Sequence, residues 1–266
     1  MRAKKSLGQH FLKSERALNT IVESGHVAIG DSILEIGPGT GALTKKLLES
    51  GASVVAVEKD DELFRLLKDL YKKEIGNGKL VLVHGDILEH DLSKLVPSKY
   101  KLVANIPYNI TGAIFKKFLE VEKQPETIVL LVQKEVAERI VARDGKESIL
   151  SVSVKVYGKP RYVEKVLAGS FLPPPKVDSA IIAVENISKE FFEKSSEKRF
   201  FEMLRAGFKS KRKKLSSNLG EIFGKDRVEK IFVELGLDKN IRAEDLSISD
   251  WKKLSGALLN TEASSR

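Results

Sequence analysis

Short apolar runs alternate with amphipathic stretches through the first two thirds of the chain, and turn residues bound each run. Runs that are apolar throughout are typical of strands buried on both faces of a parallel sheet. The stretches between them carry apolar side chains at helical spacing. The pattern therefore predicts strands at 32–36, 53–57, 80–83, 101–104 and 128–132, and helices at 41–49, 60–73, 110–120 and 134–143.

This alternation of strands and helices favours an α/β fold with a doubly wound, Rossmann-like sheet. In such a fold ligands bind outside the carboxyl ends of the strands, so we expect the functional motifs in the loops from strand to helix. Asp60 stands where it can cap the amino terminus of the second predicted helix.

The pattern changes near residue 186, because apolar and aromatic side chains then recur at helical spacing with no further strand-like alternation. We expect an α/β domain over 1–185 and a smaller, all-helical carboxyl-terminal domain over 186–266, with helices at 224–235 and 249–259. The segment 147–157 is ambiguous. Its valines alternate with Ser and Lys as in a strand, yet a buried helix fits the segment equally well.

Basic residues are concentrated in two segments of this chain of 266 residues with net charge +9. Residues 1–16 carry five basic and one acidic side chain, residues 198–214 carry eight and one, and the remainder is nearly balanced. Each segment could be a solvated helix face, but two focused basic patches on a balanced body are typical of proteins that bind polyanions. Nucleic acid is the leading partner.

Composition excludes several classes of protein. The chain has no cysteine, and its four histidines are scattered, so disulfide scaffolds, thiol catalysis and a metal site are not expected. No apolar stretch is long enough for a membrane span, and the amino terminus lacks a signal-peptide apolar block, so we expect a cytoplasmic protein without a membrane partner. The chain has no cysteine, two methionines and eleven Asn plus Gln residues. Because heat-adapted proteins are depleted in these thermolabile residues, we expect a heat-adapted source.

A glycine-rich loop follows the first predicted strand, in the segment Glu35 to Gly41. Gly37 and Gly39 let the backbone turn sharply and approach a ligand closely. Glu58 ends the next strand, where a carboxylate accepts hydrogen bonds from ribose hydroxyls in this architecture. These features fit NAD and S-adenosylmethionine equally well. Asp86, after the third strand, could accept a hydrogen bond from an adenine amino group or could serve only as a turn residue.

Three motifs carry a resemblance to a known family. The first is Asn105–Tyr108, after the fourth predicted strand, and the others are Gln9–Leu12 and Phe171–Ser179. Together they resemble the rRNA adenine N6,N6-dimethyltransferase (KsgA-type) family over nearly the whole chain, with Ile106 in place of the first proline of the related Asn-Pro-Pro-Tyr motif. The resemblance implies S-adenosylmethionine as methyl donor and no metal. It also implies that 147–157 is helical.

The resemblance further implies a substrate and a set of site residues. The substrate would be two adjacent adenosines in a loop near the 3′ end of small-subunit rRNA, each dimethylated within a pre-ribosomal small subunit by a monomeric enzyme whose helical domain docks the RNA. Cofactor contacts implied by it are His10, Leu12, Gly37, Gly39, Glu58, Asp86 and Asn105.

An adenine amino nitrogen is a weak nucleophile, so its N–H groups must be held by acceptors that favour a pyramidal nitrogen. The Asn105 side chain and the Ile106 carbonyl can accept them, while Pro107 stiffens the loop. Tyr108 offers a ring face to the base, and Phe171 could close it from another side, although core packing is the simpler role for either ring. The basic run predicted to contact RNA phosphates comprises Lys209, Lys211, Arg212, Lys213 and Lys214.

Two rival classes of protein stay open at this point. An NAD-dependent oxidoreductase would share the glycine loop and Glu58, but the Asn105–Tyr108 segment would then have no purpose. A noncatalytic RNA- or DNA-binding factor could keep the same fold as a scaffold. Only methyl transfer itself separates the scaffold from the enzyme.

Overall fold

The computed structural model describes residue 4, residues 7–193 and residues 196–259. Within these the chain divides into two compact units. The first takes the chain up to Ala137 together with Lys159–Ile187, and the second takes Glu138–Gly158 and the chain from Ser188 onward. The chain passes from the first unit to the second for the last time between residues 187 and 188, two residues beyond the expected domain boundary. Residues 138–158 join the second unit because Tyr157 packs against Phe192 and Phe201.

The first unit is built on a seven-stranded sheet in the order β4-β3-β2-β5-β6-β9-β7. Neighbours from β4 to β6 are parallel, whereas β9 runs antiparallel to both β6 and β7. The parallel strands lie where the sequence pattern predicts them, and the two antiparallel strands were not predicted. The strands are β2 (Ser32–Ile36), β3 (Ser53–Glu58), β4 (Leu80–His84), β5 (Lys101–Asn105), β6 (Thr127–Gln133), β7 (Lys159–Val166) and β9 (Ser179–Glu185).

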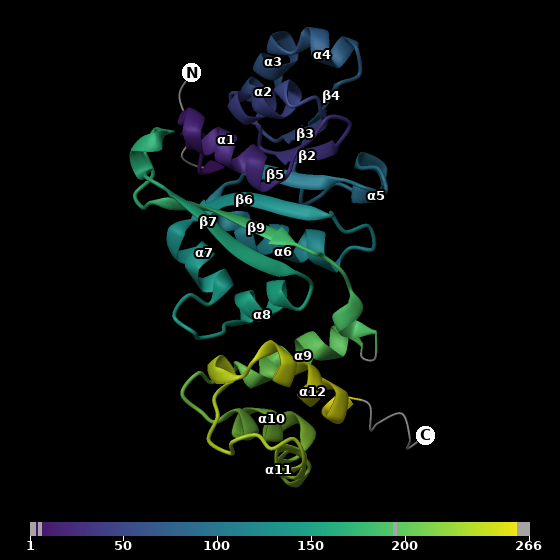
Figure 1. Ribbon diagram of the computed structural model, residues 1–266, viewed down its shortest axis with the longest axis vertical. Coiled ribbons are helices and arrows are strands. Elements are labelled where there is room, and N and C mark those ends of the chain that lie inside the picture. The colour runs from purple at the N-terminus through teal and green to yellow at the C-terminus, as the bar shows by residue number, and fades with distance from the viewer. Residues whose placement is uncertain (1–3, 5–6, 194–195, 260–266) are drawn as a thin grey trace. The chain divides into compact units, whose positions relative to one another are not determined.

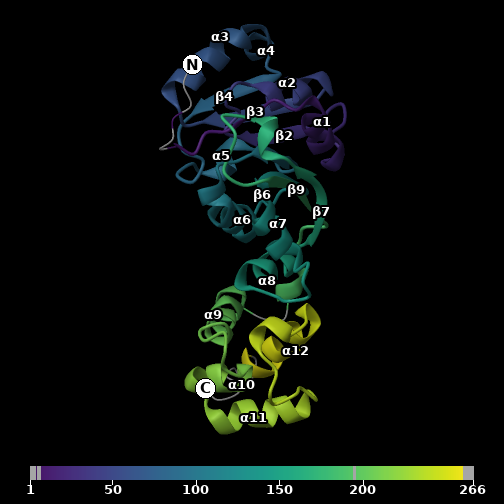
Figure 2. The same ribbon diagram turned by 90° about the vertical axis from the view of Figure 1, so that its left-hand side faces the viewer.

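Helices cover both faces of this sheet, with α1 and α2 on one side and α5 and α6 on the other (Figure 2). The predicted helix at 60–73 is divided at Tyr71 into α3 and α4. Asp60 caps α3 as predicted, since its side chain accepts the backbone N–H groups of Glu62 and Leu63. The helices are α1 (Glu15–Ser24), α2 (Ala42–Glu49), α3 (Asp61–Leu70), α4 (Lys72–Gly76), α5 (Leu92–Leu95), α6 (Thr111–Glu120) and α7 (Lys134–Val141).

A small second sheet joins two segments that are far apart in sequence. Strand β1 (Phe11–Leu12) pairs antiparallel with β8 (Phe171–Leu172). Leu12 and Phe171 are both buried in the core of the first unit, together with side chains from β2, β3, β6 and β9. The pairing therefore fixes the amino-terminal segment to the first unit.

The second unit is helical (Figure 1). A buried aromatic cluster that includes Phe192, Phe200 and Phe201 forms part of its core, and Trp251 is fully buried. The ambiguous valine-rich segment is the helix α8, whose amino terminus is capped by Ser148 in a capping box with Ser151 of the first turn. The helices of the second unit are α8 (Ile149–Lys155), α9 (Glu197–Gly207), α10 (Leu215–Phe223), α11 (Lys225–Glu234) and α12 (Ile248–Leu259).

Both units match the expected class, an α/β sheet followed by a helical carboxyl-terminal region. Across the described ranges, no helix combines the length and the apolar character that crossing a membrane requires.

Candidate active site

A cavity of about 230 Å³ opens at the carboxyl ends of the parallel strands in the first unit. Its lining comes from the loops after β2, β3, β4 and β5 and from the amino-terminal segment around β1. This is the edge of the sheet where ligands bind in doubly wound folds. The predicted site residues in the lining are His10, Leu12, Gly37, Gly39, Glu58, Asp86, Asn105, Ile106, Pro107 and Tyr108.

The glycine loop between β2 and α2 has the conformation that only glycine adopts easily. Gly39 has φ +61°, and a Cβ there would lie 3.1 Å from the Phe11 ring. Gly41 has φ +86°, and a Cβ there would meet the Tyr71 ring at 2.8 Å. A side chain at either position would add backbone strain and steric conflict. Glycine is therefore required for this tight turn, which lines the cavity through Gly37 and Gly39.

Glu58, at the end of β3, is a buried carboxylate that supports this loop. Its Oε2 accepts the Gly39 N–H at 3.0 Å, and its Oε1 accepts the Asp60 N–H at 2.8 Å. Burial raises the pKa of Glu58 above its ordinary value, although these backbone hydrogen bonds oppose the shift. The predicted contact of this carboxylate with ribose hydroxyls stays a prediction.

Asp86 has the turn role as well as a place in the cavity lining. One carboxylate oxygen accepts the Leu88 N–H at 2.9 Å, and the other binds the Lys59 Nζ at 2.8 Å. The Lys59 ammonium holds the pKa of Asp86 below its ordinary value. The side chain is therefore a charged acceptor at the rim of the cavity, and its contact with adenine stays a prediction.

Asn105 ends β5, and its amide is oriented by the amino-terminal segment. Its Nδ2 donates to the His10 carbonyl at 3.3 Å. Within the part of the chain that the structure describes, no donor binds its Oδ1, so the oxygen is free to accept a ligand hydrogen. The loop continues through Ile106, which is buried, and through Pro107, whose φ of −57° and ψ of 135° are extended. A one-turn helix, Tyr108–Ile110, follows at once.

Tyr108 is held by its hydroxyl and by a contact on one face of its ring. Its hydroxyl forms a hydrogen bond with the Ser179 hydroxyl at 2.6 Å, and the His10 ring stacks on it with centroids 6.1 Å apart. The His10 Nδ1 lies 2.8 Å from the Pro173 carbonyl. These contacts fix the orientation of an aromatic ring in the cavity lining, and its stacking on a base stays a prediction.

Phe171 does not line the cavity. Its ring is 1% exposed and belongs to the hydrophobic core. A base could touch the ring only if this packing opened, so a role as the second wall of a base pocket stays a prediction that the observed packing does not favour.

The sequence analysis missed one residue of the cavity lining, and it missed the contacts that hold the amino-terminal segment beside the cavity. Glu35, at the end of β2, lines the cavity and accepts the Thr44 hydroxyl at 2.6 Å. Asp60 also binds the amino-terminal segment, through Lys4 at 3.0 Å and Gln9 at 2.9 Å. Although burial alone would raise the pKa of Asp60, these hydrogen bonds keep it below its ordinary value. The acidic cap of a predicted helix was a visible signal, but its distant partners were not.

The basic run lies in the second unit, between α9 and α10, and its five side chains are exposed. Arg2 and Lys5 of the basic amino-terminal segment lie outside the described residues. Among the described residues, no cluster of three His, Asp or Glu side chains has the arrangement of a metal site.

The acceptor set fits S-adenosylmethionine. A glycine loop leads into α2, and the carboxylates of Glu58 and Asp86 both line the cavity, where their contacts with ribose and adenine stay predictions. The Asn105–Tyr108 loop lines the same cavity. The fold and the site together define a Rossmann-like, S-adenosylmethionine-dependent methyltransferase.

Comparison with known proteins narrows this class. The profile of the ribosomal RNA adenine dimethylase family matches residues 1–258. A ribosomal RNA small subunit methyltransferase A from Dehalococcoides mccartyi (strain CBDB1) is 44% identical over 260 residues, which are 96% of this chain and 88% of that protein. Its namesake from Nostoc sp. (strain PCC 7120 / SAG 25.82 / UTEX 2576) is 42% identical over 272 residues, covering 97% of this chain and 98% of that protein.

Two crystal structures resemble more than nine tenths of the chain. A dimethyladenosine transferase from Plasmodium falciparum has a TM-score of 0.78 at 28% identity, covering 92% of this chain and 96% of its own. The 23S rRNA methyltransferase ErmE has a TM-score of 0.76 at 28% identity, covering 93% and 99%. The chain belongs to the ribosomal RNA adenine dimethylase family. It is an adenine dimethyltransferase, and its methyl donor is S-adenosylmethionine.

Proposed function

We propose that this enzyme dimethylates N6 of two adjacent adenosines in a loop near the 3′ end of small-subunit rRNA during ribosome assembly. It acts as a cytoplasmic monomer on a pre-ribosomal small subunit, with the first unit as the methyltransferase domain and the second docking the RNA. The choice of the small subunit is supported by the curated relatives, which are named for it and are more than 40% identical.

The orientation of Asn105 carries the catalytic part of this proposal. Because the His10 carbonyl holds the amide nitrogen, the amide oxygen is left as the acceptor for one N6 hydrogen. The Ile106 carbonyl is the second acceptor, and Tyr108 stacks on the base. Two acceptors placed in this way draw electron density toward the amino nitrogen as it becomes pyramidal. Bound S-adenosylmethionine supplies the methyl group on a sulfonium, so no metal is required.

The adenosine must leave its helix before it can react, because N6 of a stacked and paired adenine cannot reach a methyl group inside this cavity. In the second round the nitrogen carries only one hydrogen, so one of the two acceptors must turn away or go unpaired. Asn105 can do this by side-chain rotation, which would break its hydrogen bond to the His10 carbonyl.

The test is incubation of the protein with labelled S-adenosylmethionine and with either small or large ribosomal subunits that lack adenine methylation, followed by mapping of the labelled nucleosides. We expect N6,N6-dimethyladenosine at two neighbouring positions of small-subunit rRNA. Label confined to the large subunit would contradict this proposal and would favour 23S rRNA, the substrate that the name of ErmE gives, in its place. Absence of label from both, with S-adenosylhomocysteine still bound, would favour the noncatalytic scaffold.

A further inference from the structure

The segment Phe208–Lys214, called here the basic loop, is held in one conformation by buried side chains. Asn218, on α10, is 1% exposed and donates from Nδ2 to the Gly207 carbonyl at 2.7 Å and to the Ser210 carbonyl at 3.1 Å. The Phe208 ring stacks on Trp251 with centroids 5.9 Å apart. The loop is therefore fixed at its start and in its middle.

Two lysines of the basic loop converge on one carboxylate. Lys209 Nζ lies 2.7 Å from Oε2 of Glu221, and Lys213 Nζ lies 3.2 Å from Oε1. Glu221 stands three residues after Asn218 on α10, so one face of this helix both anchors the loop and binds its lysines. Hydrogen bonds from the two lysines hold the pKa of Glu221 below its ordinary value, so the group is an anion at neutral pH.

The other three basic side chains of the loop have a different environment. Lys211, Arg212 and Lys214 are exposed, and none forms an ion pair with another residue in the described ranges. The loop thus presents three unmasked charges beside a pair of ammonium groups that a single oxyanion bridges.

We propose that Lys209 and Lys213 form a preformed clamp for an RNA phosphate, and that Glu221 occupies the position of that phosphate in the free protein. The inference rests on the proposed function, in which the second unit docks RNA. Two non-bridging oxygens of a phosphate can bridge the same two ammonium groups that the carboxylate bridges. Exposed ion pairs contribute little net stability, so a phosphate can displace Glu221 at small cost.

Displacement of Glu221 affects how RNA binding depends on salt. Displaced Glu221 regains its own counterions, which offsets part of the counterion release that drives protein–RNA association. Glu221 therefore weakens binding to any phosphate backbone and makes it less dependent on salt. Unmasked Lys211, Arg212 and Lys214 attract RNA first, and the clamp engages only when a phosphate is held close to it.

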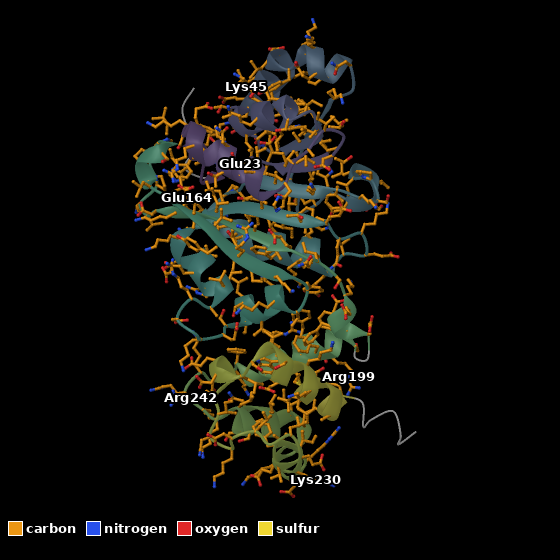
Figure 3. All side chains as sticks on the ribbon, in the orientation of Figure 1. Glu23, Lys45, Glu164, Arg199, Lys230 and Arg242 are labelled. Atoms are coloured by element: carbon orange, nitrogen blue, oxygen red, sulfur yellow. The ribbon has the colours of Figure 1, made fainter. Side chains whose placement is uncertain are left out.

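The test compares Glu221→Gln with Glu229→Gln in the full-length protein. Both substitutions raise the net charge by one, but Glu229 lies on α11 and pairs there with Lys225, outside the basic loop. Lys230, labelled in Figure 3, marks this helix. Thermal melting checks that each variant folds. Binding of a short RNA duplex of arbitrary sequence is measured between about 50 and 200 mM salt, the range in which phosphate contacts change affinity most clearly.

We expect Glu221→Gln to bind the duplex about two- to fivefold more tightly at low salt, which corresponds to about 0.4–1 kcal/mol. Its log–log salt slope should be steeper by up to about 0.9, while the slope of Glu229→Gln stays that of the parent. Equal gains in both variants would reduce the effect to net charge and overturn the clamp.

A third variant, with Lys209 and Lys213 both replaced by alanine, separates the clamp from the proposed function. Weaker binding in that variant together with no gain in Glu221→Gln would leave the loop as an RNA-binding segment and refute the masking by Glu221. Replacing all five basic residues of the loop with alanine should flatten the salt slope by about 0.7–0.9 for each phosphate that the variant no longer neutralises. An unchanged slope there would refute the RNA-docking role of the loop itself.

Discussion

Glu35→Gln should change the pH dependence of stability more than any other single substitution in the cavity. The Glu35 carboxyl is 1% exposed, and burial raises its pKa from an ordinary 4.5 to about 8, with a further contribution from the nearby Glu58 charge. The folded state therefore binds this proton more tightly than the unfolded state does. The resulting stabilisation is complete below about pH 4.5 and is lost as the pH rises toward 8.

The magnitude follows from the shift of the Glu35 pKa. A rise from 4.5 to about 8 corresponds to about 5 kcal/mol at 1.36 kcal/mol for each pH unit, as an upper value. Glutamine removes the titration and can still accept the Thr44 hydroxyl through its amide oxygen. Part of the titration lies below pH 5, so the variant should gain, relative to the parent, about 2–4 kcal/mol of unfolding free energy between pH 5 and pH 8.5.

Urea unfolding followed by far-ultraviolet circular dichroism, without cofactor, measures this difference at both pH values. Glu23→Gln is the matched control, because Glu23 is exposed on α1 (Figure 3) and should give the same difference from the parent at both. The reasoning is refuted if the Glu35→Gln difference changes by less than about 0.5 kcal/mol between the two pH values, the size of an ordinary surface effect.

Three further outcomes are expected. Asn105→Ala should fold and bind RNA but lower the single-turnover methylation rate by about 100–1,000-fold, as for a missing oxyanion-hole donor, and a rate within about threefold of the parent would count against the assigned role. Glu58→Ala should weaken S-adenosylhomocysteine binding in a calorimeter by about 1.5–3 kcal/mol for each charged hydrogen bond removed, while RNA binding persists; unchanged cofactor affinity would remove Glu58 from the site. The parent protein should melt above the range of about 45–65 °C usual for mesophilic domains, and a midpoint inside it would contradict a heat-adapted source.

The parallel half of the sheet was predictable because its strands are locally distinctive. Strands β2, β3 and β6 are short apolar runs between turn residues, and burial on both faces produces that pattern without reference to a partner. Strand β7 has no such pattern. It is an edge strand in which half of the side chains are Lys, Arg or Glu, and a bulge lies between Tyr162 and Glu164. The position of β7 in the sheet depends on its pairing with β9, and no local sequence pattern encodes that pairing.

The valine-rich helix α8 shows why alternation can mislead. Val152 and Val154 are fully buried, and so is Ser151 beside them. A helix buried on several sides does not need a polar face, so its sequence loses the 3.6-residue period. Only the family resemblance favoured a helix there, and the structure confirms it.

Residue types in the site were predictable, whereas their partners were not. The order of Gly37, Glu58, Asp86 and Asn105 follows from strand order, because each stands at or just beyond the end of a parallel strand. The His10 carbonyl that orients Asn105 lies 95 residues away in sequence, so only the folded chain could reveal that contact. The ion pairs of Lys209 and Lys213 with Glu221 could not be predicted either, because composition shows only that the run is basic.

The stacking of Phe208 on Trp251 gives the protein a built-in optical probe. Trp251 is the only tryptophan of the chain, and its indole is fully buried against the first residue of the basic loop. Emission excited at the red edge of the absorption band therefore comes from a single ring beside that loop. If RNA binds the loop as proposed, a rearrangement of Phe208 on binding would change the environment of this fluorophore, and docking could then be followed in real time on the unlabelled enzyme.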